Sequence, residues 1–154
     1  MPAIKQLGPE NIAAYRAMMR MFSEAFEDPE NYEAAPPSDS YVRVLLGKAH
    51  FIALVAEEEG EVVGGIAAYE LEKFEQERSE IYIYDLAVSQ THRRKGIATA
   101  MINHLRTLAA ARGAWMVFVQ ADHGDDPAIS LYQSLGLREE VLHFDISVAG
   151  PDRD

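Results

Sequence analysis

Three consecutive basic residues and a glycine stand between two patterned segments, in the stretch Arg93-Arg94-Lys95-Gly96. Residues 81–88 alternate as a strand does, and residues 97–112 have the spacing of an amphipathic helix. The first N–H groups of a helix have no partner inside it, and the macrodipole makes that end positive. Gly96 removes the side chain that would keep a ligand away from those groups. The order strand, basic turn, helix therefore predicts a site for an anion such as a phosphate.

A carboxylate lies inside the strand that precedes this turn. Apolar neighbours raise the pKa of a carboxyl group towards a value that suits a base, so Asp85 is the first candidate for a general base. The alternative is a structural ion pair with an arginine. Strict alternation along residues 81–88 predicts two sets of side chains, one on each face of the strand. The first set is Ile81, Ile83, Asp85 and Ala87, and the second is Tyr82, Tyr84, Leu86 and Val88.

The composition limits the classes of protein and partner. The chain has 154 residues, 48% of them apolar, which fits one domain over residues 1–149 with a disordered tail at 150–154. Fourteen basic and 25 acidic residues give a net charge of −11, which argues against nucleic acid and favours a cationic partner. No cysteine is present, and the five histidines do not cluster at metal-ligand spacing, so we expect no metal. Without a signal peptide or membrane span, the expected location is cytoplasmic and no membrane partner is expected.

The periodicity predicts a single mixed α/β domain. Two strands precede helices that cross back over the sheet, so we expect parallel neighbours there. Gly64-Gly65 inside a strand indicates a bulge or a close backbone approach. Residues 27–31 are expected to be an acidic loop, and Asp126 is expected to cap the last helix, with Pro127 at its first position. Strands are predicted at residues 3–7, 51–56, 62–69, 81–88, 115–120 and 141–148, and helices at 10–26, 39–46, 97–112 and from 126 to Gly136.

The pattern Arg-x-x-Gly-x-Ala after such a strand resembles the pyrophosphate loop of the GCN5-related N-acetyltransferases, and the predicted element order is similar to theirs. The resemblance implies a mixed central sheet of about six to seven strands flanked by about four helices, with acetyl-CoA as co-substrate. It also implies that the strand before the loop splays from its neighbour and binds the pantetheine. The residues that would hold acetyl-CoA are Leu86, Ala87, Val88, Arg93, Arg94, Lys95, Gly96, Ile97, Ala98 and Thr99.

The segment Ala128 to Gly136 resembles the family's late helix, whose tyrosine lies near the thioester sulfur. That tyrosine falls on Tyr132, which would protonate the departing thiolate. The alternative is a core tyrosine, because Ala128, Leu131 and Leu135 share its helical face.

Four longer blocks, at residues 74–88, 92–100, 119–128 and 138–146, resemble the type I aminoglycoside 3-N-acetyltransferases. The resemblance implies acetyl transfer to the 3-amino group of an aminoglycoside in a ternary complex, antibiotic resistance, and a homodimer. Alternatives are acetylation of another polycation, such as a polyamine or basic peptide, and a catalytically silent acetyl-CoA-binding module. A polycation needs carboxylates in its site. The candidates are Asp85, Asp125, Asp126, Glu140 and Asp145, with Asp122 and Glu139 beside them.

Overall fold

The computed structural model describes residues 1–150 and consists of two compact units, Met1–Gln120 and Ala121–Asp154, each described by itself below. The prediction of one domain over residues 1–149 stays a prediction. Of the tail expected to be disordered at 150–154, residues 151–154 lie outside the described residues.

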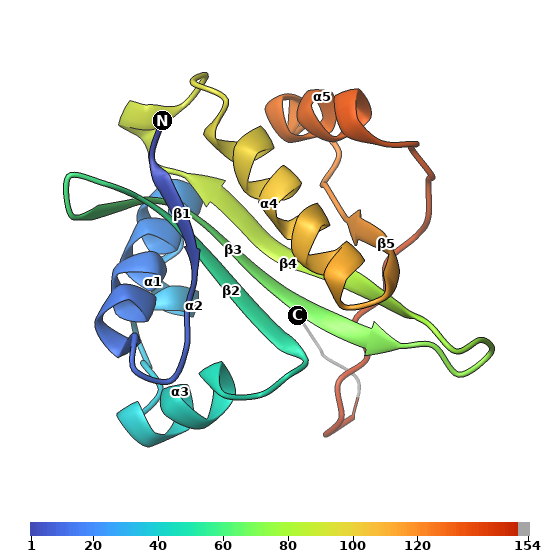
Figure 1. Ribbon diagram of the computed structural model, residues 1–154, viewed down its shortest axis with the longest axis horizontal. Helices are drawn as coiled ribbons and strands as arrows, with labels where there is room; N and C mark the ends of the chain where they lie inside the picture. Colours follow the sequence, from blue (N-terminus) through green and yellow to red (C-terminus); the bar gives the residue numbers. More distant parts are fainter. Residues whose placement is uncertain (151–154) are drawn as a thin grey trace. The chain divides into compact units, whose positions relative to one another are not determined.

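The first unit is built on a five-stranded sheet in the order β1-β2-β3-β4-β5 (Figure 1). The first four strands pair antiparallel, and β4 pairs parallel with β5. A parallel pair needs a crossover, and α4 supplies it, so the expected parallel neighbours are confirmed here. The strands are β1 (Ala3–Gln6), β2 (Phe51–Glu58), β3 (Glu61–Glu72), β4 (Ser79–Val88) and β5 (Ala114–Val119), and α4 is Ile97–Ala111.

Three helices lie between β1 and β2, where the sequence predicted two. They are α1 (Ile12–Phe26), α2 (Pro29–Tyr32) and α3 (Asp39–Leu46). The extra helix, α2, falls in the segment expected to be an acidic loop. Asp28 caps it by accepting a hydrogen bond from the Asn31 backbone N–H at 3.2 Å, and Pro29 occupies its first turn. The cap and the proline were the local signals of a helix start.

Helices cover both faces of the sheet, and two adjacent glycines of β3 let them come close. A Cβ added to Gly65 would lie 2.8 Å from Met18 Cγ on α1, whereas one added to Gly64 would lie 3.0 Å from Met101 Cε on α4. Successive residues of a strand point to opposite faces, so α1 and α4 lie on opposite sides (Figure 1). The close approach expected at these glycines is confirmed.

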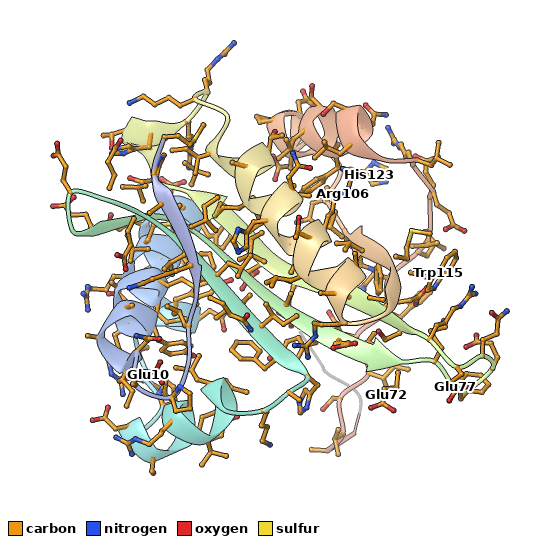
Figure 2. The ribbon with its side chains drawn as sticks, in the orientation of Figure 1. Glu10, Glu72, Glu77, Arg106, Trp115 and His123 are labelled. Carbon is orange, nitrogen blue, oxygen red and sulfur yellow. The ribbon has the colours of Figure 1, made fainter. Side chains whose placement is uncertain are left out.

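The β3–β4 hairpin and the basic loop lie at opposite ends of β4 (Figure 1). In the hairpin, the Arg78 guanidinium sits 3.8 Å from the ring centroid of Trp115, near the start of β5. Figure 2 labels Trp115 with Glu72 and Glu77 at this end of the sheet. The hairpin end is therefore remote from the part of β4 that adjoins the basic loop.

The second unit contains one helix, α5 (Asp126–Leu135), among its described residues. Its N-cap is Asp125, whose Oδ1 accepts a hydrogen bond from the Ala128 backbone N–H, so the expected cap at Asp126 is wrong by one residue. Pro127 is thereby at the second helical position.

The strand expected at 141–148 is absent from the described structure, where this segment has no strand partner. In and just before this segment, side chains two residues apart bond to each other, with Arg138 to Glu140 at 2.7 Å and His143 to Asp145 at 2.9 Å. Alternation predicts which side chains share a face, but not that a neighbouring strand pairs with the segment. The described chain thus has five strands rather than six to seven, and five α-helices rather than about four. None of its helices is long and apolar enough to cross a membrane.

Candidate active site

A β-bulge in β4 decides which way Asp85 points. Ile83 pairs with Ala68 of β3 and Asp85 pairs with Ala67, so Tyr84 is an extra residue without a cross-strand partner. Ala67 and Ala68 point to opposite faces of β3, and so their partners Asp85 and Ile83 do as well. The expectation that Asp85 shares a face with Ile81 and Ile83 is therefore wrong. The bulge turns Asp85 to the face covered by α1, and it turns Leu86 and Val88 to the face of α4 with Ile81 and Ile83.

Asp85 has a phenol rather than an arginine as its partner. The Tyr32 hydroxyl, at the end of α2, donates a hydrogen bond to Asp85 Oδ2 at 2.8 Å. The Tyr32 ring packs against Phe22 and Phe26 of α1, with ring centroids 5.9 and 5.5 Å away. The contact thus depends on the helix that the sequence did not predict, and no arginine among the described residues pairs with Asp85.

Burial raises the pKa of Asp85 above its ordinary range, and the hydrogen bond from Tyr32 opposes that change. The first cause is desolvation, since the carboxylate is half-buried beneath α1 and α2. The same burial, followed by the bond to Asp85, raises the pKa of Tyr32. Asp85 is therefore a carboxylate of enhanced basicity whose partner is a phenol that stays protonated.

The edge of β4 beyond Asp85 is free of its parallel neighbour. The β4–β5 pairing ends at Ile83 and Val119, while β3 still pairs with β4 as far as Val88. β5 itself ends at Val119, so β4 extends beyond its parallel neighbour, and the splay implied by the resemblance stays a prediction. Along this opened edge, Leu86 to Val88 have no strand partner on the β5 side within the described residues.

The basic loop follows directly. Arg94 has φ 64° and Gly96 has φ 80°, both left-handed, and α4 begins at Ile97. A Cβ on Gly96 would have only Met1 Cε near it, at 3.9 Å, so the glycine is required by its backbone angle and faces open space. No side chain caps α4, and its first turn contains no acidic residue. The N–H groups of residues 97–99 therefore lack a side-chain acceptor in the described structure.

The charged side chains of the loop divide into two kinds. Arg93 donates from Nε to the Val88 carbonyl oxygen at 3.3 Å and so joins the loop to the end of β4. Arg94 and Lys95 are exposed and have no hydrogen bond or ion pair with any described residue. His92 Nε2 lies 2.8 Å from Glu58 Oε2, which holds the other side of the loop to β2. Two cations thus remain available for an anion beside the uncapped helix end.

A row of aromatic rings extends along the sheet from Asp85. Tyr84 lies 6.1 Å from Tyr69 and 5.8 Å from Tyr82, between ring centroids, and Tyr82 stacks on Phe118 at 4.8 Å. Burial is the first cause of the raised pKa of Tyr69 and of Tyr82, and the charge of Asp85 adds to both. Tyr84, in the bulge, is 63% exposed. The four rings therefore form one connected row from Tyr69 on β3 to Phe118 on β5.

The remaining predicted site residues belong to the second unit. Tyr132 lies on α5 and is half-buried. Asp125 caps α5, Asp126 is in its first turn, and Glu140 and Asp145 have local basic partners. The structure thus brings Asp85, the opened edge of β4 and the basic loop together in the first unit. Among the described residues, no group of His, Cys, Asp and Glu side chains could hold a metal ion.

Comparisons of the whole chain with known proteins point to one family. The model of the Acetyltransferase (GNAT) family matches residues 13–137. The aminoglycoside acetyltransferase HMB0005, from an uncultured soil metagenomic sample, is 57% identical with a TM-score of 0.94, over 96% of this chain and 99% of that one. The aminoglycoside acetyltransferase meta-AAC0020, also from soil and solved with sisomicin, is 31% identical with a TM-score of 0.88, over 95% of each chain.

A curated relative extends the comparison to mammals. N-acetyltransferase family 8 member 2 of Rattus norvegicus is 34% identical over 101 residues, which are 66% of this chain and 44% of the rat protein. The chain therefore spans less than half the length of this relative.

Proposed function

Because the chain belongs to the Acetyltransferase (GNAT) family, we propose that it transfers an acetyl group from acetyl-CoA to the 3-amino group of an aminoglycoside. The observation that carries the proposal is the placement of Asp85. A half-buried carboxylate of raised pKa lies where β4 parts from β5, next to an uncapped basic loop. The likeness of the whole chain to two aminoglycoside acetyltransferases supports this choice of acceptor.

The residues around the loop fit the phosphates of coenzyme A. Arg94 and Lys95 supply positive charge, and the N–H groups of Ile97, Ala98 and Thr99 point out of the helix start. Gly96 provides the left-handed turn that the loop needs, and Arg93 holds the loop against β4. The opened edge at Leu86, Ala87 and Val88 would bind the pantetheine, and an N–H there would polarise the thioester carbonyl.

In the proposed reaction, Asp85 takes a proton from the acceptor amine as the nitrogen bonds to the thioester carbonyl carbon. The carbon–sulfur bond then breaks, and Tyr132 gives its phenolic proton to the leaving sulfur. The products are the N-acetylated amine and the coenzyme A thiol, and exchange of protons with solvent restores both side chains. Both substrates are bound together, so no acetyl group is carried by the protein.

The acceptor side combines charge with aromatic surface. A net charge of −11 attracts a polycation. Tyr84, exposed beside Asp85, offers a ring face to an ammonium group or to the apolar face of a sugar. Asp125, Asp126, Glu140 and Asp145 are proposed to pair with further ammonium groups. A role in antibiotic resistance, a cytoplasmic location and a homodimer stay predictions.

Thiol release from acetyl-CoA tests the proposal, with gentamicin, sisomicin, spermidine and a basic peptide as acceptors. We expect turnover with the two aminoglycosides at a kcat/KM at least tenfold above that with spermidine. A ratio of about this size corresponds to the loss of one polar contact between substrate and site. Turnover confined to spermidine or the peptide would replace the aminoglycoside by another polycation. Binding of acetyl-CoA without any turnover would leave the silent binding module as the function.

A further inference from the structure

We propose that Tyr32 is a positioning residue for the base: it fixes the Asp85 carboxylate in one orientation and sets the pH at which Asp85 can accept a proton from the acceptor amine. The inference rests on the proposed function, since it assigns a role to Tyr32 in the same reaction. It is carried by one contact, the hydrogen bond of 2.8 Å from the Tyr32 hydroxyl to Asp85 Oδ2.

The contact is held from both sides. On one side, Tyr32 ends a single turn of helix that begins with Pro29 and is capped by Asp28, and its ring is packed against Phe22 and Phe26. On the other side, the bulge at Tyr84 turns Asp85 towards α2. Bulges redirect side chains in this way next to active sites.

The hydrogen bond from Tyr32 gives the two oxygens of the Asp85 carboxylate different roles. Oδ2 accepts the Tyr32 proton, and Oδ1 has no hydrogen-bond donor among the described residues. One oxygen is therefore anchored while the other remains open to an incoming amine. A hydrogen bond to one carboxylate oxygen keeps the other oxygen turned towards the acceptor amine. A base that is positioned for proton transfer needs such a fixed orientation.

The electrostatic surroundings leave Tyr32 as the group that restrains the pKa of Asp85. The titratable groups near the pair are phenols on β3 and β4, namely Tyr69, Tyr82 and Tyr84, and Asp28 at the start of α2. No described lysine, arginine or histidine contributes to the pKa of Asp85. Burial raises that pKa, and the Tyr32 hydrogen bond alone lowers it. Without the bond, Asp85 would hold its proton to a higher pH.

The test measures kcat/KM for an aminoglycoside acceptor as a function of pH, in Tyr32→Phe and in the wild type. Phenylalanine keeps the ring contacts and removes only the hydroxyl. We expect the acidic limb of the profile to move to higher pH, with a loss on the order of tenfold at its acidic end and recovery at its alkaline end. Tyr41→Phe is the control: this exposed tyrosine of α3 has no hydrogen bond to Asp85, and the limb should not move. An unmoved limb in folded Tyr32→Phe would overturn the proposal.

Two further measurements keep the inference independent of turnover and of folding. Carbon-13 NMR titration of the Asp85 carboxyl should give a higher pKa in Tyr32→Phe than in the wild type, even if no acceptor is found. Site-specific 3-fluorotyrosine at position 32, a stronger donor of the same shape, should move the midpoint the other way, to lower pH. Equal titration of Asp85 in all three proteins would overturn the role of Tyr32, whereas absent turnover with shifted midpoints would overturn only the proposed reaction.

Discussion

Replacing Asp85 by asparagine should separate catalysis from stability. The asparagine side-chain oxygen can still accept the Tyr32 hydrogen bond, so the bulge and α2 should remain in place. The substitution removes the carboxylate oxygen that accepts a proton from the acceptor amine. General-base catalysis contributes about 10²–10⁴-fold to a rate. Since Asp85 is only half-buried and water can replace it in part, we expect a fall in kcat of about 10²–10³-fold, or roughly 3–4 kcal/mol of barrier.

The Asp85→Asn substitution should lower activity without lowering the stability of the folded protein. The pKa of Asp85 is raised in the folded protein, so the folded state binds its proton more tightly than the unfolded chain does. Stability therefore falls as pH rises from the ordinary carboxyl pKa of about 4 through the raised value, and the loss is complete above that window. The Asp85→Asn variant has no titrating group at this position, so it does not lose stability in this way. Its melting temperature should be equal to or above that of the wild type at neutral pH, and the difference should disappear in acid.

The assay is thiol release at saturating acetyl-CoA, together with melting curves at neutral and acidic pH. Asp28→Asn is the matched control, because this nearby carboxylate caps α2 and asparagine caps a helix equally well. We expect it to keep wild-type kcat within about twofold. If Asp85→Asn retained full kcat, or if it lost activity only because it unfolded, the assignment of Asp85 as the base would be refuted.

Three further substitutions test other parts of the molecule. Lys95→Glu should weaken acetyl-CoA binding by about tenfold or more in calorimetry, because it reverses a charge in the uncapped loop. Lys48→Glu, at another exposed lysine, should leave the affinity unchanged. Equal affinities of the two variants would refute the phosphate site. Tyr84→Leu should raise KM for the aminoglycoside about threefold to tenfold and leave KM for acetyl-CoA unchanged, while Phe74→Leu, at a site 98% exposed in the hairpin, should change neither. Gly65→Val should lower stability by about 1–3 kcal/mol in denaturant titration, since its Cβ would lie 2.8 Å from Met18 Cγ; unchanged stability would mean that α1 does not pack as described.

The elements that depend on local pattern were predictable from the sequence. Helix α3 and the hairpin of β2 and β3 fall where periodicity and turn residues placed them, and the basic loop lies between β4 and α4 as expected. The family and the mixed α/β fold expected from the resemblance are confirmed. These features follow from the order of apolar residues and from glycines, which act within a few positions along the chain.

Features that depend on distant partners were not predictable. Alternation placed Asp85 on the face of Ile83, and the bulge at Tyr84 reversed it, because the extra residue is defined only by the pairing with Ala67 and Ala68 of β3. No sequence pattern marks Tyr32, since its proposed role arises from a contact with a residue 53 positions away. Asp28-Pro29 did signal the short helix that positions it, but so short a turn is fixed by packing on α1 rather than by propensity. The segment 141–148 shows the converse case, a strand pattern without a paired neighbour.

The most direct test of the account is the structure of the product formed from ¹³C-acetyl-CoA and sisomicin. Two-dimensional NMR of the purified product would show which amine carries the labelled acetyl group. The account predicts a single acetylated nitrogen, at position 3 of the deoxystreptamine ring, formed by the wild type and formed about 10²–10³-fold more slowly by Asp85→Asn. A product acetylated at another nitrogen would contradict the proposed regiochemistry, and the absence of labelled product would contradict the proposed acceptor.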